Sequence, residues 1–442
     1  MNNISVELFD LRSKSDNQNV YVLTQTADAF KVTFNHFKKR CLSQAKFLEL
    51  EGINRTTRVL CVIPDHIETA GLFHALTRLG AQMFFVHHDI DVEDLAEICN
   101  LCQIEVIIGD SKSIFQIKSV EKIYALFDVL DFRYPELEES YNYQDDDFAV
   151  GFVTKKSHEY FELTSFTHGE LVAAMNDMDQ VFQFDADSQV LNTALPVCHP
   201  LGLMINAIAP FRYHGTHYLF KFYAEISAMN RYINQHKINV FFGNPYTIDI
   251  MLNHSRTELS HRPDKFYVTG ERLPTCLWKM CQEKYQITPI NLFSVSSSLL
   301  PLFNHAGSDP TQLGAPSNNI EVELSTEGIL KFRTIGSDTW QQTSDIVVVD
   351  DQAHYRYICR QEFYQKIGDS IINCLDIEDR LLTHDDVEDC QVRFDQQAQL
   401  IGNVVLKPGR QLSELDLCAF INHNAQWHFV EEIPRTLMKK KT

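Results

Sequence analysis

The sequence predicts an α/β chain with a large N-terminal domain of stacked mixed sheets flanked by helices, a β region and a small C-terminal α+β cap domain. Two observations support this class. Short apolar runs alternate with segments of helical periodicity from residue 58 to residue 293. Between residues 320 and 350 the apolar side chains change to a period of two, which is typical of antiparallel strands with one buried face.

The first alternation begins with the apolar run at residues 58–63, which predicts a buried strand. A helical pattern follows at residues 68–79, and a second strand is expected at residues 82–86. Residues 92–102 predict the next helix and residues 104–108 the third strand. Strands that alternate with helices in this way are joined by right-handed crossovers, so these three are expected to form a parallel sheet.

The same alternation returns in the second half of the large domain. Strands are expected at residues 189–195, 240–242, 265–268 and 288–293, and helices at residues 201–210, 246–253 and 277–285. Beyond residue 361 the pattern predicts a helix at residues 375–382, strands at residues 389–394 and 401–406, and a last helix that begins after Ser413 and ends near Asn422. We therefore expect two domains, residues 1–360 and residues 361–442.

The charge balance limits the function classes. The 442 residues carry 39 Lys and Arg against 59 Asp and Glu, a formal charge of −20. Nucleic acids and anionic membranes attract basic faces, so neither a nucleic-acid partner nor a membrane-surface role is expected. No apolar run reaches about 18 residues, so no membrane span is expected either.

The eleven cysteines are scattered, and residues 1–18 are polar rather than leader-like, which favours reduced thiols and a cytoplasmic protein. One pair, Cys99 and Cys102, has the CxxC spacing without a second pair or histidines at zinc spacing. It lies in an amphipathic stretch, so buried core thiols are favoured over a metal or redox site. We predict no metal site from the sequence.

Five segments carry local motifs at informative positions. They are Thr154–Leu163 followed by Thr167-His168, Phe293–Ser297 (FSVSS), Thr343-Ser344-Asp345, Cys359-Arg360 and Pro434–Lys440 (PRTLMKK). In order and spacing they resemble the motifs of the adenylate-forming superfamily, which contains acyl- and aryl-CoA synthetases, luciferases and peptide-synthetase adenylation domains. The resemblance covers nearly the whole chain. It implies a protein in which an acid attacks ATP to give an acyl-adenylate, and a thiol then displaces AMP.

The first motif corresponds to the family's glycine-rich phosphate loop, which makes Thr154 and Ser157 candidate nucleotide-binding residues by resemblance. Glycines allow backbone N–H groups to close on phosphate oxygens, but Thr154–Leu163 has none. Glu162 stands where the family has a lysine, and it would repel a triphosphate. Lys155 and its neighbour Lys156 could partly compensate. The alternative is a strand–turn–strand segment without any phosphate role.

The second motif places Phe293 against an adenine ring by resemblance, and Ser296 keeps the family's hydroxyl. Ser297 replaces the family's glutamate, which removes a hard-cation ligand and makes Mg²⁺ binding doubtful. The resemblance also assigns Gly270 to a turn that passes near the adenine. An ATP or AMP site with weak or altered binding is therefore expected.

The remaining motifs supply ribose and catalytic residues by resemblance. Asp345 would accept hydrogen bonds from both ribose hydroxyls, which suits a carboxylate, and Arg360 would also contact the ribose. Lys440 matches the family lysine that binds the reacting carboxylate and the α-phosphate. The alternative for Lys440 is a solvated basic tail. His199, in a Pro-x-x-His-x-x-Gly segment, would lie at the acyl pocket.

Two functions follow from this pattern. The first is a divergent ligase that activates a small aryl or acyl carboxylic acid as acyl-AMP and passes it to the thiol of CoA or of an acyl carrier protein. The second is a non-catalytic relative that keeps the fold for ligand binding, scaffolding or regulation. Groups expected at the adenine, the ribose and the reacting carboxylate are kept, whereas those expected at the β- and γ-phosphates and Mg²⁺ are lost. The site is therefore expected to hold an AMP-like group better than Mg-ATP.

Overall fold

The computed structural model describes residues 3–11, 17–24, 30–64, 66–110, 112–130, 134–157, 160–220, 228–335, 337–367 and 370–435. Contacts divide the chain into two compact units, and each is described here by itself. The first unit comprises residues 1–242, 255–263 and 294–301, and the second comprises residues 243–254, 264–293 and 302–442. The predicted boundary at residue 360 is a different division, and it stays a prediction.

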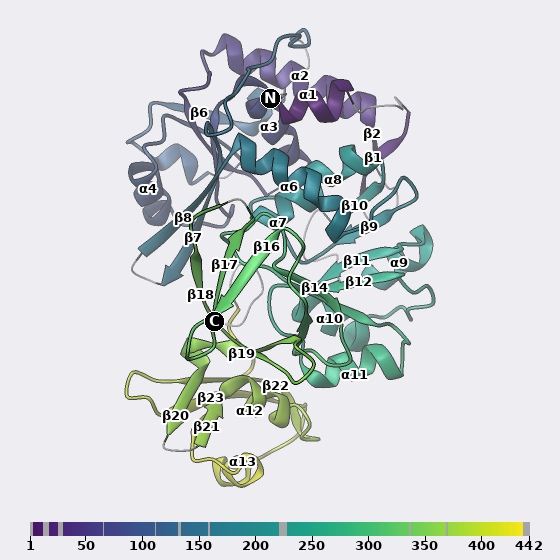
Figure 1. Ribbon diagram of the computed structural model, residues 1–442, viewed down its shortest axis with the longest axis vertical. Coiled ribbons are helices and arrows are strands. Elements are labelled where there is room, and N and C mark those ends of the chain that lie inside the picture. Colours follow the sequence, from purple (N-terminus) through teal and green to yellow (C-terminus); the bar gives the residue numbers. More distant parts are fainter. Residues whose placement is uncertain are drawn as a thin grey trace. The chain divides into compact units, whose positions relative to one another are not determined.

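The first unit contains a six-stranded sheet in the order β6-β5-β3-β4-β7-β8, of which β6, β7 and β8 are labelled in Figure 1. Its strands are β3 (Arg58–Val62), β4 (Gln82–Phe85), β5 (Val106–Gly109), β6 (Lys122–Ala125), β7 (Phe148–Ser157) and β8 (Tyr160–Thr167). All neighbouring pairs are parallel except β7 and β8, which form an antiparallel hairpin. The predicted parallel arrangement of the first three strands is confirmed, with β3 between β4 and β5.

Five further strands of the first unit follow the order β11-β9-β10-β1-β2. They are β1 (Asn19–Thr24), β2 (Phe30–Thr33), β9 (Gln189–Asn192), β10 (Thr216–Phe220) and β11 (Val240–Gly243). Strand β9 ends three residues before the predicted end at Leu195. The reason is a local turn, because the Asn192 side chain accepts hydrogen bonds from the backbone N–H groups of Ala194 and Leu195.

Side-chain caps fix the beginnings of several helices in the first unit. Thr33 caps α2, Asp91 caps α4, and Thr167 with Glu170 forms a capping box on α6. The helices are α1 (Ile4–Val6), α2 (Phe34–Leu50), α3 (His66–Leu79), α4 (Val92–Leu101), α5 (Leu126–Val129), α6 (His168–Val181), α7 (Pro200–Leu203), α8 (Ala209–Tyr213) and α9 (Met229–His236), with short π or 3₁₀ turns η1 (Glu7–Leu11), η2 (Ile114–Gln116) and η3 (Met204–Ile208).

The second unit begins with parallel strands β12 (Lys265–Val268) and β13 (Pro289–Phe293), beside which β14 (Phe303–Ala306) runs antiparallel. Its helical segments here are α10 (Pro245–Asp249), η5 (Ile250–His254) and α11 (Thr275–Glu283). The predicted antiparallel β region is confirmed as a five-stranded sheet in the order β15-β19-β18-β17-β16. Its strands are β15 (Gln312–Gly314), β16 (Ile320–Leu324), β17 (Ile329–Thr334), β18 (Gln341–Val349) and β19 (Tyr355–Arg360).

The C-terminal segment of the second unit has the predicted α+β composition. After η6 (Gln361–Phe363), it contains the hairpin β20 (Tyr364–Ile367) and β21 (Ser370–Asn373), α12 (Cys374–Leu381), β22 (Val387–Phe394), β23 (Leu400–Leu406), α13 (Glu414–Ile421) and β24 (Gln426–Phe429). The predicted cap is confirmed, because the Ser413 hydroxyl accepts a hydrogen bond from the Asp416 N–H. Strand β24 was not predicted; it pairs with β23 in parallel.

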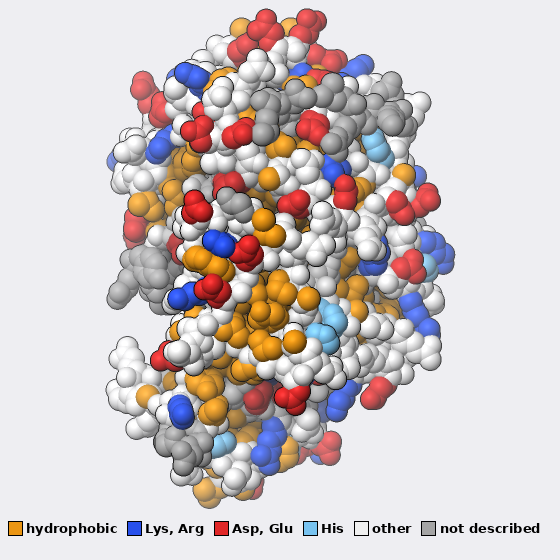
Figure 2. Space-filling model, viewed as in Figure 1, with side chains coloured by type: hydrophobic (Ala, Val, Ile, Leu, Met, Phe, Trp, Pro, Cys, Tyr) orange, Lys and Arg blue, Asp and Glu red, His pale blue; other side chains and the backbone are white. Residues whose placement is uncertain are grey.

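Cys99 and Cys102 are both buried in an apolar cluster under α4, which agrees with the prediction of core thiols. Within the described residues, no helix combines the length and apolar character that crossing a membrane requires. On the face drawn in Figure 2, Lys and Arg side chains are scattered among Asp and Glu rather than gathered into one basic patch.

Three buried histidines in the first unit make its stability depend on pH. Burial lowers the pKa of His74 and of His217 to about 3, and that of His168 to about 4, from an ordinary value of 6.5. Each is neutral in the folded chain at pH 5 but protonated when unfolded, so the unfolded state binds more protons. The free energy of unfolding is therefore not reduced by these histidines above pH 6.5. It falls as the pH drops toward 4, by at most about 1.4 kcal/mol per pH unit for each histidine.

We expect the urea midpoint of unfolding to decrease from pH 7 to pH 5, and the decrease to be smaller in His217→Phe. His254→Gln is the control, because His254 is half exposed. Equal midpoints at the two pH values would contradict this prediction.

Candidate functional site

A buried carboxylate and a guanidinium face each other on neighbouring strands of the second unit. Asp345 on β18 is paired in register with Arg360 at the end of β19. Asp345 is only 8% exposed, and its Oδ1 lies 4.0 Å from Arg360 Nε. The shorter ion pair of Arg360 is with Glu362, at 3.1 Å. A carboxylate can accept two hydrogen bonds at once, which suits the two hydroxyls of a vicinal diol.

The threonine of the same motif fixes the backbone beside Asp345. The Thr343 hydroxyl donates to the Leu330 carbonyl at 3.0 Å and accepts from the Asp345 N–H at 3.0 Å. This side chain therefore holds the start of the motif against β17, at the place where the pairing of β17 and β18 shifts register. The sequence motif Thr-Ser-Asp thus has a structural explanation for its first residue, and its last residue places a carboxylate opposite Arg360.

An aromatic pair lies next to this carboxylate. Phe293 ends β13 and is half-buried, and its ring centroid is 5.7 Å from that of Tyr357 on β19. Burial, followed by the charge of Asp345, raises the pKa of Tyr357 well above its ordinary value. We call Phe293, Asp345, Tyr357 and Arg360 the aromatic–carboxylate cluster. It combines flat apolar faces, a diol acceptor and a cation, which together suit a nucleoside phosphate.

Tyr357 was missed by the sequence reasoning. The signal that could have found it is the strand periodicity of β19, because Tyr355 and Tyr357 alternate on one face of the strand that ends at Arg360. Tyr355 contacts Phe303 at 5.3 Å in the same way that Tyr357 contacts Phe293.

Gly270 follows β12 at the start of a tightly held loop. Its φ of +92° lies in the left-handed region that favours glycine, and the residue is exposed. Two residues later, Arg272 is buried, with a side chain 5% exposed, and binds Asp376 at 3.1 Å and Asp379 at 3.0 Å on α12. Thr275 also donates to Asp379 through its N–H and its hydroxyl. The Gly270 loop is therefore joined to the C-terminal segment by a charged and fully hydrogen-bonded contact.

Replacement of Arg272 by alanine is expected to lower the free energy of unfolding by about 2 kcal/mol, because Asp379 then keeps only Thr275 as a partner. Urea unfolding measures this. Arg410→Ala is the matched control, since that arginine is 59% exposed and makes one ion pair at 3.2 Å with Asp386. Equal losses of stability in the two variants would contradict the role given to Arg272.

The segment that corresponds to the phosphate loop lies in the antiparallel pair of β7 and β8. Thr154 pairs with Glu162 and Ser157 with Tyr160 across it. The Lys155 ammonium donates to Asp94 on α4 at 2.5 Å, which raises the pKa of the lysine, and it lies 5.4 Å from the centre of the Phe161 ring. Figure 1 shows α4 next to this hairpin. The Lys155 charge is therefore already neutralised by a carboxylate.

The donor set of the second motif does not fit Mg²⁺. Ser296 and Ser297 are half-buried in the turn after β13, and the adjacent Ser298 hydroxyl donates to the Leu300 carbonyl at 2.7 Å. Mg²⁺ in proteins is bound through carboxylates, and this turn offers hydroxyls at the motif positions. No step of the chemistry proposed below is assigned to the metal.

His199 is half-buried at the beginning of α7. Its N–H donates to the Pro196 carbonyl at 3.1 Å, and its carbonyl accepts from Leu203 at 2.8 Å. Gly202 lies directly against this turn, since a Cβ there would stand 1.8 Å from the Pro196 carbonyl oxygen. The Pro-x-x-His-x-x-Gly segment is therefore a close-packed turn that sets the backbone position of His199. Lys440 lies outside the described residues, as do all positions after Arg435.

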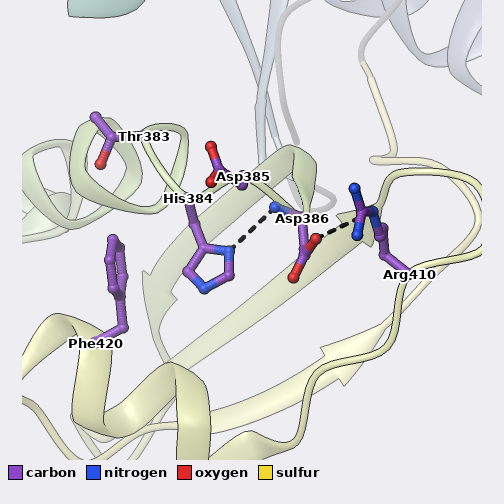
Figure 3. Close-up of a pocket in the computed structure, with 6 residues that line it drawn as sticks. All are labelled: Thr383, His384, Asp385, Asp386, Arg410 and Phe420. Carbon is purple, nitrogen blue, oxygen red and sulfur yellow. Dashed lines mark hydrogen bonds and ion pairs between the residues drawn. The ribbon is translucent and has the colours of Figure 1, made fainter.

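A shallow polar depression occurs elsewhere in the C-terminal segment (Figure 3). His384 accepts from the Asp386 N–H at 3.1 Å and makes an edge contact with Phe420, and Asp386 pairs with Arg410. These groups satisfy one another, and none of the predicted site residues lines the depression.

The family model for the AMP-binding enzyme matches residues 12–156 and 165–326, well over half of the chain. The chain belongs to the AMP-binding enzyme family. The predicted membership in the adenylate-forming superfamily is thereby confirmed. The match omits residues 157–164, which include the end of β7 and the first part of β8, and it ends before Asp345, Arg360 and Lys440. A search of curated proteins finds no match.

Solved structures of CoA ligases share the fold. An anthranilate CoA ligase in complex with anthranoyl-AMP aligns with a TM-score of 0.84 at 18% identity, over 100% of this chain and 95% of that one. A benzoate CoA ligase from Burkholderia xenovorans LB400 aligns with a TM-score of 0.85 at 17% identity, over 100% of this chain and 99% of that one. An o-succinylbenzoate CoA synthetase from Bacillus subtilis in complex with AMP aligns with a TM-score of 0.83 at 15% identity, over 100% of this chain and 97% of that one. The predicted α/β fold class is confirmed.

Proposed function

We propose that this protein is a divergent adenylate-forming ligase that activates a small aryl or acyl carboxylic acid as acyl-AMP and passes it to a thiol of CoA or of an acyl carrier protein. The observation that carries the proposal is the aromatic–carboxylate cluster, which offers a stacking face, a diol acceptor and a cation in one place. Two solved structures of the same fold are complexes with AMP or anthranoyl-AMP, which supports the assignment. The scattered free thiols favour a cytoplasmic location.

The proposed reaction has two steps. A carboxylate oxygen of the acid attacks the α-phosphorus of ATP, an acyl–phosphate bond forms, and pyrophosphate leaves. The thiol sulfur then attacks the acyl carbon, and AMP leaves. In this scheme Asp345 and Arg360 hold the ribose, Phe293 lies against the adenine, Lys440 stabilises the charge that develops on the reacting oxygens, and His199 lies at the acyl pocket.

The nucleotide preference follows from the hairpin. It has no glycine between Thr154 and Leu163 and carries Glu162 where the family has a lysine, and Lys155 is bound to Asp94. A triphosphate would meet the carboxylate of Glu162 and few free backbone N–H groups, because strand pairing occupies them. We therefore propose that AMP or acyl-AMP is bound in preference to Mg-ATP.

A second candidate is favoured by the same hairpin: a non-catalytic relative that binds AMP-like ligands without activating an acid. ATP–pyrophosphate exchange over a panel of aryl and acyl acids separates the two. The ligase predicts acid-dependent exchange above background that is lost in Lys440→Ala. Absence of exchange with every acid, in a protein that binds AMP, favours the non-catalytic relative.

A further inference from the structure

Two adjacent histidines and an aspartate lie at one edge of the six-stranded sheet, outside the site described above. His87, His88 and Asp89 follow β4, in the connection that leads to α4. Among the residues that the structure describes, they form a group whose nitrogen and oxygen ligand atoms all lie within 4.8 Å of one another. None of the motifs discussed above includes them.

The connection between β4 and α4 runs beside the β7–β8 hairpin. At its beginning, Phe85 of β4 pairs with Phe152 of β7, and at its end Asp94 of α4 binds Lys155 of β7. Both ends of this short segment are thus fixed to the same strand. The three side chains are therefore presented from a loop with anchored ends rather than from a free tail.

Local contacts already bring the three groups together. The rings of His87 and His88 stack with centroids 4.4 Å apart and planes inclined by 29°. His88 Nε2 lies 3.2 Å from Asp89 Oδ1, and His87 Nδ1 lies 3.9 Å from Asp89 Oδ2. The Asp89 N–H also donates to His87 Nδ1 at 3.3 Å, a long bond that metal coordination would replace.

The chemistry of the group fits a divalent transition metal. Imidazole nitrogens with one carboxylate suit Zn²⁺ and its neighbours, whereas Mg²⁺ and Ca²⁺ prefer oxygen ligands. In a tetrahedral site with metal–ligand bonds of about 2.0–2.1 Å, the ligand atoms lie about 3.3 Å from one another. The side chains of His87, His88 and Asp89 would therefore have to move by about 1 Å to bind one metal ion. Side-chain exposures of 16% and 32% for the histidines and 59% for Asp89 leave room for that movement and for access from solvent.

The surrounding charges favour a cation. Asp91, Glu93 and Asp94 follow within the first turn of α4 and its cap. The nearest described lysine on the hairpin, Lys155, is neutralised by Asp94. We propose that His87, His88 and Asp89 form a binding site for one divalent transition metal of the Zn²⁺ class, with the fourth position open to water or an external ligand.

Titration of metal-free full-length protein with ZnCl₂, followed by calorimetry, tests this. One equivalent is expected to bind at these residues, and CoCl₂ is expected to give the visible absorption of a low-coordinate nitrogen–oxygen site. His87→Ala, His88→Ala and Asp89→Asn should each weaken binding at least about tenfold. His254→Ala is the matched control, because His254 lies 3.3 Å from Asp249 in a single His–Asp pair.

The cysteines are a competing class of zinc ligand, and the cobalt spectrum separates them because thiolate ligands give intense charge-transfer bands. Zinc binding that is unchanged in all three variants, or a spectrum with thiolate bands, overturns the proposal, as does the absence of binding. Asp89→Asn keeps the test decisive if a histidine variant does not fold, since Asp89 is largely exposed.

Discussion

Replacement of Gly202 by alanine is expected to lower the free energy of unfolding by about 3 kcal/mol or more, because the new methyl group would overlap backbone atoms. The Cβ would lie 1.8 Å from the Pro196 carbonyl oxygen and 2.7 Å from its carbonyl carbon. Relief requires the Pro196–His199 turn to move, which breaks the hydrogen bond from the His199 N–H to the Pro196 carbonyl. The same movement displaces His199, so acid binding is expected to suffer in any fraction that folds.

Gly71→Ala provides the matched control. Gly71 is a buried glycine inside α3, and its Cβ would meet the end of the Gln44 side chain at 3.2 Å, which can rotate away. Alanine also favours helix by up to about 1 kcal/mol. Chemical unfolding of both variants measures the difference. A Gly202→Ala protein as stable as Gly71→Ala would show that the turn does not hold the backbone as described.

Asp345→Asn is expected to weaken AMP binding roughly 10- to 100-fold, with little change in the unfolding midpoint. Hydrogen bonds to a charged acceptor contribute about 1.5–3 kcal/mol each, and the amide keeps one acceptor oxygen and loses the charge. Asparagine has the same shape, and the backbone is still held by the Thr343 hydroxyl. Calorimetric titration with AMP measures the loss.

Asp351→Asn is the control for this substitution, since Asp351 lies in an exposed turn between β18 and β19. It should bind AMP as the unmodified protein does. AMP affinity that is the same in Asp345→Asn and Asp351→Asn would remove Asp345 from the proposed ribose contact. A fall in both affinity and stability of Asp345→Asn would instead assign the carboxylate a structural role.

The fold was largely predictable because periodicity records burial. Residues 59–63 are all apolar, since β3 lies between two parallel neighbours, and the predicted strand boundaries agree to within one residue. The apolar side chains that alternate with a period of two between residues 320 and 350 likewise predicted the antiparallel sheet. The end of β9 was predicted too late, because the Asn192 turn is made by a side-chain hydrogen bond that hydrophobicity does not record.

The site was less predictable, because its contacts join residues far apart in sequence. Spacing and resemblance pointed to Phe293, Asp345 and Arg360, but Tyr357 became visible only through its ring contact with Phe293. Lys155 was considered as a compensating phosphate ligand, and its ion pair with Asp94 depends on a helix 61 residues earlier in the chain. The functional roles of all the predicted site residues stay predictions: Thr154, Ser157, His199, Gly270, Phe293, Ser296, Asp345, Arg360 and Lys440.

The charges at the β7–β8 hairpin show where the acidic composition bears on nucleotide binding. A formal charge of −20 by itself indicates only solubility. In the hairpin, however, Glu162 pairs across from Thr154, and the nearby Lys155 already has Asp94 as its partner. We therefore expect the negative charge at this place to disfavour a triphosphate without affecting the adenosine half of the nucleotide.

The central claim is that the chain binds an AMP-like group better than Mg-ATP. Calorimetric titration of the same protein with AMP, a non-hydrolysable acyl-adenylate mimic and Mg-ATP tests it most directly. We predict tighter binding of AMP and of the mimic than of Mg-ATP, with the advantage reduced in Glu162→Lys, which restores the family's charge on the hairpin. Equal or tighter binding of Mg-ATP by the unmodified protein would contradict the account.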